Sequence, residues 1–119
     1  MSWRTVVIAS RAKLDYQMGY LVVRSEETRR VFLDEVALLL LENTAVSVTG
    51  VLLSELVRRK IRVILCDEKR DPTAELCPYF GSHDSARRLR RQLAWTEEAC
   101  AAVWAAIVAE KIRNQAQAL

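Results

Sequence analysis

The stretch VALLLLENTAVSVTGVLLSELVRRKIRVILCDEKRDPTAEL, residues 36–76, decides the fold of this chain. It contains an apolar run at 37–41 and a short β-branched run at 45–48, and both predict strands. A segment with helical spacing follows, and the run RVILCD at 62–67 then predicts a buried strand. A proline ends this regular structure, and a second proline predicts that a last strand at 73–79 lies at a sheet edge.

The helix within this stretch is predicted to run from a cap at Thr49 to about Lys60. A basic triplet, Arg58, Arg59 and Lys60, lies at its carboxyl end, where the helix dipole favours cations. The apolar stripe that this helix turns towards the core consists of Val51, Leu52, Leu56 and Val57.

The residues before this stretch indicate further short strands. Between 13 and 18, apolar and polar residues alternate strictly, which is typical of a half-buried strand. Gly19 permits a tight turn, so residues 20–24 are predicted to return as the hairpin partner. Further strands are predicted at 4–9 and 30–33, on either side of that hairpin. The apolar face of the strand before the turn carries Leu14, Tyr16 and Met18.

Two helices are predicted after Gly81. Asp84 or Ser85 can cap the first, and Thr96 can cap the second, which runs to the end of the sequence. An isolated helix would not leave a broad apolar face in water. The second helix could fold back on the strands, but we expect it to be the first helix of a bundle that this chain does not complete. That face carries Cys100, Val103, Trp104, Ile107, Val108 and Ile112.

These patterns together predict an α+β fold class. Residues 1–80 are expected to form a β-rich, sandwich-like domain with one internal helix. Residues 81–119 are expected to be a linker and the first helices of a helical domain that this chain does not complete. A chain of 119 residues has room for one domain and part of another.

Composition excludes several classes of protein. With 51% hydrophobic and 28% charged residues, the chain is not intrinsically disordered. Its net charge of +3 indicates a mild preference for anionic partners. Neither a signal peptide nor a membrane-length apolar run is recognisable, so a cytoplasmic protein without membrane contact is expected. The three cysteines, Cys66, Cys77 and Cys100, are odd in number and widely spaced, which predicts buried free thiols.

Four arginines within five positions form the strongest local signal for binding. At 100° per residue they span about 160° of the first late helix, opposite its apolar line. A guanidinium fork matches two phosphate oxygens, so such a row suits a nucleic-acid backbone. The alternative is a solvated helix face that pairs with acids from elsewhere in the fold. The predicted DNA-binding row is Arg87, Arg88, Arg90 and Arg91.

Basic and aromatic residues also occur together in and beside the predicted hairpin. Aromatic side chains beside cations can stack on unpaired or terminal bases. The alternative is that the two tyrosines pack in the core or across the strands. The candidate DNA-binding residues here are Arg11, Lys13, Tyr16 and Tyr20, with Arg24 beside them.

No complete catalytic set is recognisable. His83 is the only histidine, which supports neither a zinc cluster nor a catalytic triad. The acids at 67–71 surround two basic residues, which indicates a solvated charged turn more than a metal site. A small enzyme that uses Cys66 or Cys77 stays a further alternative, although no base is placed beside either thiol.

Three quoted stretches carry a resemblance that covers essentially the whole sequence. They are WRTVVIASRAKLDY at 3–16, VALLLLENTAVSVTGVLLSELVRRKIRVILCDEKRDPTAELCPYFGSHDS at 36–85, and QLAWTEEACAAVWAAIVAEKIRNQA at 92–116. The chain resembles the amino-terminal portion of the CRISPR-associated endonuclease and integrase of type II systems. Those proteins capture foreign DNA as new spacers in antiviral defence.

The resemblance implies more than the residues themselves show. In that family the helical domain binds a divalent metal, Mg²⁺ or Mn²⁺, through a Glu, a His and an Asp that lie downstream of the stretches quoted. His83 belongs to the GSHD turn and is not one of those ligands, so no metal and no catalysis are expected in this chain.

The family also implies partners. Its members form homodimers through the β-rich domain and join a second, small CRISPR adaptation protein. Together they hold double-stranded DNA, the protospacer, whose 3′ hydroxyls attack the repeat. This chain is therefore expected to contribute dimerisation and DNA-backbone contacts. The alternative is a β-rich protein–protein interaction module without DNA affinity of its own.

Overall fold

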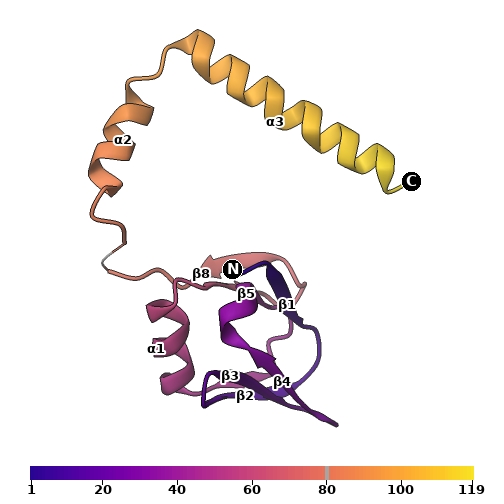
Figure 1. Cartoon of the computed structure of the whole chain (residues 1–119). Coiled ribbons are helices and arrows are strands. Elements are labelled where there is room, and N and C mark those ends of the chain that lie inside the picture. The colour runs from indigo at the N-terminus through magenta and orange to yellow at the C-terminus, as the bar shows by residue number, and fades with distance from the viewer. Residues whose placement is uncertain (80) are drawn as a thin grey trace. The chain divides into compact units, whose positions relative to one another are not determined.

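The computed structural model describes residues 1–79 and 81–119, and the chain divides into two units, Met1–Tyr79 and Phe80–Leu119 (Figure 1). The first unit holds two four-stranded sheets and one α-helix. The second holds helices. This arrangement confirms the predicted α+β class, with a β-rich beginning that is followed by helices.

One sheet of the first unit is built on the predicted hairpin. Its strands are β2 (Ala12–Gln17), β3 (Tyr20–Arg24), β4 (Thr28–Phe32) and β6 (Val46–Val48). Their order is β4-β3-β2-β6, in which β6 joins β2 in parallel and the other pairs are antiparallel. The strand predicted at 30–33 begins earlier, because the polar residues Thr28 and Arg29 pair across to β3. Leu33–Glu35 form a 3₁₀ turn, η1.

The hairpin turn itself consists of Met18 and Gly19. Both have positive φ, 47° and 88°, as a two-residue type I′ turn requires. Met18 therefore leaves the strand and is 91% exposed. The prediction that placed it on the apolar face with Leu14 and Tyr16 was wrong, because alternation along a strand does not show where the strand stops.

The second sheet is mostly parallel. Its strands are β1 (Arg4–Ile8), β5 (Val36–Leu41), β7 (Arg62–Cys66) and β8 (Pro72–Glu75), in the order β1-β5-β7-β8. β1, β5 and β7 are parallel, and β8 pairs antiparallel at the edge. The unbroken apolar run of β5 is the pattern that parallel strands show. The predicted edge position of the last strand is confirmed, although the strand is shorter than 73–79.

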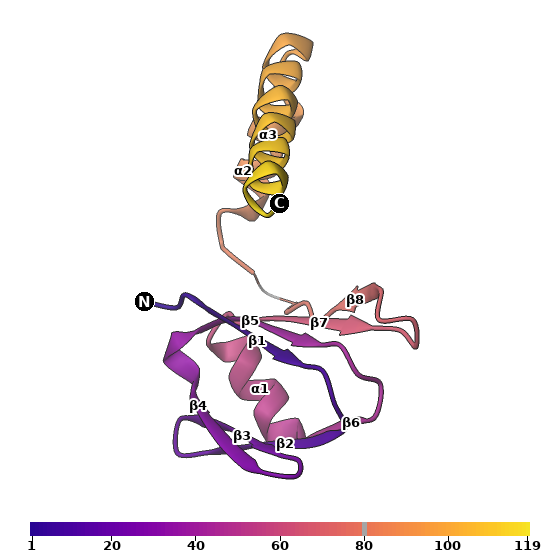
Figure 2. The same ribbon diagram turned by 90° about the vertical axis from the view of Figure 1, so that its right-hand side faces the viewer.

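α1 (Gly50–Arg58) connects the two sheets, because it follows β6 of one and precedes β7 of the other. The predicted cap is confirmed, since the Thr49 hydroxyl oxygen accepts a hydrogen bond from the Leu52 amide at 3.3 Å. The helix covers one side of the gap between the sheets (Figures 1 and 2).

The carboxyl end of α1 lies earlier than predicted. Lys60 has left the helix and adopts a φ of 59°. Its amide donates to the Val57 carbonyl at 3.0 Å, and the Ile61 amide donates to the Leu56 carbonyl at 2.9 Å. These two bonds form a Schellman motif, which ends the helix without a glycine.

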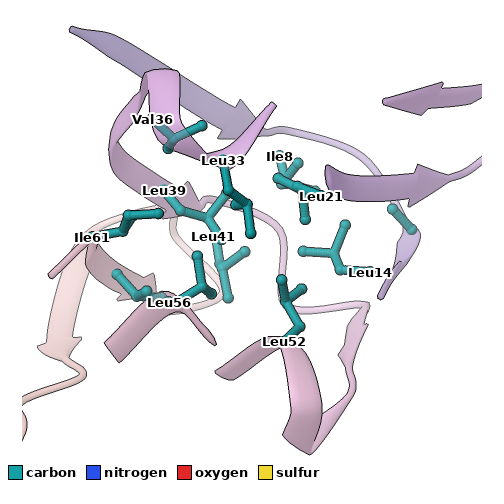
Figure 3. Close-up of a cluster of buried hydrophobic side chains, with 12 residues drawn as sticks. Ile8, Leu14, Leu21, Leu33, Val36, Leu39, Leu41, Leu52, Leu56 and Ile61 are labelled. Atoms are coloured by element: carbon teal, nitrogen blue, oxygen red, sulfur yellow. The ribbon is translucent and has the colours of Figure 1, made fainter. Parts of the chain in front are cut away.

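The core of the first unit lies between the sheets and α1, with leucines from all three converging in Figure 3. Leu52 and Leu56 are fully buried there, as predicted for the helix stripe. Val51 was predicted to share that stripe and is 62% exposed instead. The buried cluster contains Ile8, Ala12, Leu14, Leu21, Leu33, Val36, Leu39, Leu41, Leu52, Leu56, Ile61 and Val63.

The second unit contains α2 (Ser85–Leu93) and α3 (Glu97–Gln117). Asp84 occupies the cap position of α2 but makes no capping bond, whereas Thr96 caps α3 through a 3.2 Å bond from the Ala99 amide. Within the helices of this unit that the structure describes, no side chain is buried. Neither α3 nor any other described helix combines the length and apolar composition needed to cross a membrane.

Candidate nucleic-acid interface

The arginine row of α2 is the first candidate contact with nucleic acid. All four of its side chains are exposed. Arg87 pairs with Asp84, Nη2 to Oδ2 at 2.9 Å. Arg88, Arg90 and Arg91 make no ion pair with any residue that the structure describes. The guanidinium groups of these three residues therefore have no acidic partner within the part of the chain that the structure describes.

The predicted hairpin residues Arg11 and Lys13 lie in the first unit. Lys13 is on β2, where its cross-strand neighbours are Arg24 of β3 and Ser47 of β6. Arg11 immediately precedes β2. The side chains of both predicted residues are exposed, and with Arg24 they line one open hollow.

The two tyrosines of the hairpin lie on opposite faces of its sheet. Tyr16 is half-buried and packs against the core cluster, which agrees with the packing alternative. Tyr20 pairs across the ladder with Gln17, one position along from Tyr16, and so faces outwards. They cannot stack on the same base from these positions, because alternate residues of a strand point to opposite sides.

Tyr20 has partners that sequence reasoning missed. Its ring lies 5.4 Å from that of Phe32, centroid to centroid, at an interplanar angle of 49°. The Arg30 guanidinium carbon lies 5.6 Å from the Tyr20 centroid, close enough for a cation–π contact. Both partners come from β4. Predicting them would have required the register between β3 and β4, which places Phe32 opposite Tyr20.

Two cations of the basic triplet at the carboxyl end of α1, Arg58 and Arg59, are engaged within the fold. Arg58 and Arg59 both bond to Glu55, and Arg59 also pairs with Asp34 of η1. The hydrogen bond from Arg58, together with that from Arg59, holds the pKa of Glu55 below its ordinary value despite partial desolvation. Burial works to lower the pKa of Arg59, but bonding to Glu55 and the nearby Asp34 and Tyr16 raise it overall. Both arginines therefore already have acidic partners within the fold.

The thiols differ from the prediction of buried cysteines. Cys66 is half-buried, whereas Cys77 and Cys100 are exposed, because Cys77 lies beyond the edge strand and Cys100 on a helix without buried side chains. Burial, followed by the charges of Glu42, Asp67 and Asp71, raises the pKa of Cys66. A raised pKa disfavours the thiolate, which argues against Cys66 as a catalytic nucleophile.

Among the residues that the structure describes, no three His, Cys, Asp or Glu side chains are placed so that they could hold a metal ion. His83 lies exposed in the segment before α2. The acids of the 67–71 turn are used locally: the Asp67 carboxylate accepts from the amides of Lys69 and Asp71 at 2.9 and 3.0 Å. The residues that the structure describes therefore do not fit a catalytic metal.

Solved structures share this fold. A CAS1 protein from Thermotoga maritima matches 67% of the chain with a TM-score of 0.59 at 13% identity, over 28% of its own length. A Cas6-RT-Cas1–Cas2 complex matches 71% with a TM-score of 0.62 at 15% identity, over 10% of the matched chain. A casposase bound to integration product matches 82% with a TM-score of 0.53 at 10% identity, over 32% of its length.

Sequence similarity gives the family. The family described as CRISPR associated protein Cas1 matches residues 5–119, and the chain belongs to it. A CRISPR-associated endonuclease Cas1 from Neisseria meningitidis serogroup C is 32% identical over 117 residues, which is 98% of this chain. The chain spans 38% of the length of that relative.

Proposed function

We propose that this chain is a DNA-handling part of a CRISPR adaptation endonuclease, and that it contributes DNA-backbone contacts and dimerisation. One observation carries the DNA proposal: three neighbouring arginines of α2 have no partner among the described residues. The relative from Neisseria is described as an endonuclease, and a structural neighbour is bound to an integration product. Both descriptions support DNA as the ligand.

The geometry of α2 suits a phosphate backbone. Arg88, Arg90 and Arg91 span the helix face opposite Leu89 and Leu93. Each guanidinium can give two parallel hydrogen bonds to phosphate oxygens. Contacts of this kind carry affinity and position without reading base sequence.

The test is filter binding of duplex DNA at several salt concentrations. Replacing Arg88, Arg90 and Arg91 with Gln should reduce the slope of log affinity against log salt by about 0.9 for each phosphate that the chain no longer neutralises. The charge-matched control replaces three exposed cations of the first unit, Arg29, Arg62 and Lys69. An equal decrease in both triple variants would show non-specific charge attraction and would contradict the proposal.

We do not assign catalysis to this chain. In our proposal the Mg²⁺ or Mn²⁺ of the family reaction is held by residues other than those described here. The purified chain should then leave branched DNA uncut with either metal. Cleavage that survives purification and disappears on chelation would show that the chain holds a metal after all.

A second candidate function, protein–protein interaction without DNA affinity, has its own supporting observation. The strand register places Val7, Leu38, Leu40 and Ile64 on the face of the β1-β5-β7-β8 sheet that points away from the core. Val7 is 47% exposed, and the other three are half-buried. Parallel sheets are normally covered on both faces.

We propose that a second copy of the chain covers this face, with the small Cas2 protein as a further partner of the assembly. Structural neighbours that contain Cas1 and Cas2 together support the Cas2 partner. Replacing Leu38 and Leu40 with Lys should convert a dimer to a monomer, which sedimentation velocity would show. The control is Val51→Lys, at an exposed position of α1. A dimer that withstands the double change would exclude this face.

A further inference from the structure

β1 differs from the other strands that lie at the edges of the two sheets, which are β4, β6 and β8. β4 contains the neighbouring charges Arg29 and Arg30, β8 begins at Pro72, and β6 has only three residues. Charge, proline and shortness all keep a sheet edge from pairing with another chain. After Arg4, β1 has none of these features, since residues 5–8 read TVVI. β1 is therefore an edge that stays open to pairing.

The backbone of β1 has hydrogen-bonding groups on its free side. The Ile8 carbonyl accepts from the Glu42 amide at 3.1 Å, so Ile8 directs its backbone groups towards β5. Successive residues of a strand direct these groups to alternate sides, so those of Thr5 and Val7 point away from β5. Among the described residues, no hydrogen bond from outside the strand ladder reaches either of them. An added strand could pair with both without disturbing the sheet.

An open hollow of about 510 Å³ lies beside this edge, between β1 of one sheet and the β3–β4 hairpin of the other. Its floor contains Val6, Val23 and Val31, which are partly buried and pack against the core cluster. A strand added to β1 would lie about 4.8 Å from it, with alternate side chains on the same face as Val6. Those side chains would cover the three valines.

The rim of this hollow carries two acids. Glu26 and Glu27, from the turn between β3 and β4, line it together with Arg29. Glu27 pairs with Arg29 at 3.5 Å, whereas Glu26 makes no ion pair with any residue that the structure describes. The carboxylate of Glu26 therefore favours a partner that brings a cation. It forms no pair with the cations that line the adjoining hollow with it, which are Arg11, Lys13 and Arg24.

A second copy of β1 would not supply that cation. Arg4 is the only charged residue of β1. It already pairs with Glu35 of its own chain at 3.4 Å, and its guanidinium carbon lies 5.2 Å from the centroid of the Trp3 ring. The chemistry of the hollow therefore fits a different polypeptide, one with a lysine or arginine of its own.

We propose that β1 binds an extended segment of a partner protein as an added strand. Main-chain hydrogen bonds to Thr5 and Val7 supply affinity, and pockets for alternate side chains supply selectivity, as in other cases of strand addition. The segment carries apolar residues at alternate positions, over the valine floor, and a lysine or arginine that pairs with Glu26. This inference goes beyond the proposed function, because it needs neither DNA nor a second copy of the chain.

The test uses a short synthetic peptide with blocked ends, in which valine and threonine alternate and a lysine lies at each end. One control peptide has glutamate in place of lysine, and another has proline at alternate positions, which removes the amides needed for pairing. The measurement is amide hydrogen exchange of the whole chain, followed in ¹H–¹⁵N spectra. We expect the lysine peptide to slow exchange at Val7 and Thr5, and both controls to leave it unchanged.

Two variants test the edge and the acid separately. Val7→Pro removes an amide that the pairing of β1 with β5 does not use, so the sheet should persist while peptide binding is lost; Val7→Thr keeps the amide and is its control. Glu26→Gln should weaken peptide binding about fivefold, the effect of a strong surface ion pair. Its control is Glu27→Gln, which should change binding less because Glu27 already pairs with Arg29.

Three results would overturn the inference. Slowed exchange at Thr5 and Val7 that depends on the concentration of the chain alone would assign the edge to a second copy. Equal slowing by the glutamate peptide would exclude Glu26 as a partner, and peptide binding that leaves both amides unchanged would exclude an added strand. The Leu38 and Leu40 double variant should still bind the lysine peptide, so failure of the proposed dimer face and failure of this inference are distinguishable.

Discussion

Arg59, at the carboxyl end of α1, pairs with Asp34 of η1, 25 positions earlier in the sequence. The same guanidinium bonds to Glu55 through Nε at 3.2 Å, and only 19% of its side chain is exposed. Arg58 shares Glu55 but is 65% exposed and reaches no other element. One cation of the triplet therefore joins helix to turn, and its neighbour does not.

Replacing Arg59 with Gln should accordingly destabilise the first unit. The variant lacks the charged hydrogen bond that connects α1 to η1 and the bond to Glu55. Because Asp34 is largely exposed, we expect a decrease of only about 1–2 kcal/mol in the free energy of unfolding. Urea unfolding at constant m-value measures it. Arg58→Gln is the matched control and should stay close to wild type. Equal decreases in the two variants would contradict the role given to Asp34.

Glu55 should make stability depend on pH in the acid range. Its pKa is lowered from an ordinary 4.5 in the folded chain, so folding favours its ionised form. The stabilisation is fully present above the ordinary value and is lost as pH falls through the lower, folded value. Glu55→Gln should unfold more easily than wild type at pH 7, and the gap should close towards pH 3. A gap that is constant with pH would show that ionisation is irrelevant.

The hairpin turn offers a stabilising substitution. Met18 has a φ of 47°, which costs an ordinary side chain about 1 kcal/mol or more, while Asn adopts this conformation readily in type I′ turns. Met18→Asn should raise the thermal midpoint by several degrees, about 4–8 °C per kcal/mol for a unit of this size. Calorimetry measures the midpoint.

Gly19→Ala should act in the opposite direction. Its φ of 88° is the obstacle, since a Cβ there would meet Phe32 only at an ordinary 3.5 Å. Gly50→Ala is the control, because a Cβ at Gly50 meets nothing within 4 Å and the residue begins a helix. A Gly19→Ala variant as stable as the Gly50→Ala variant would argue against the type I′ turn.

The three thiols should react in a defined order. Iodoacetamide attacks the thiolate, and the pKa of half-buried Cys66 is raised by burial and by neighbouring acids. Cys77 and Cys100 are exposed and should be alkylated first at pH 8, as peptide mass spectrometry would show. In urea, where the unfolded chain exposes all three thiols, their alkylation rates should become similar. A fast Cys66 in the folded chain would revive the alternative of a cysteine enzyme.

Much of the fold followed from local patterns. The strand–helix–strand order of residues 36–76, the caps at Thr49 and Thr96 and the edge position of the last strand were all predicted. Each depends on residues close in sequence: an apolar run, a hydroxyl before a helix, a proline that cannot donate a hydrogen bond. Two of the errors concern where elements stop, at Met18 and Lys60, both of which are non-glycine residues with a left-handed backbone.

The candidate site divides in the same way. The arginine row of α2 was visible in the sequence, because helical geometry alone decides which side chains share a face. Three other features could not be read from the sequence. They are the opposite faces of Tyr16 and Tyr20, the pairing of Tyr20 with Phe32 and the cross-strand pairing of Lys13 with Arg24. They depend on how strands align, and a shift of one residue would reverse every face.

The sequence by itself determined the class of the fold, the position of its helices and the presence of an arginine row on one of them. Only the tertiary structure decided which charges are already used, since Arg59 is neutralised by an acid 25 positions away and Lys13 is placed beside another cation. The physical reason is distance. Capping, turning and helical periodicity act within a few residues, whereas electrostatic pairing depends on which strands and helices the packed core brings together.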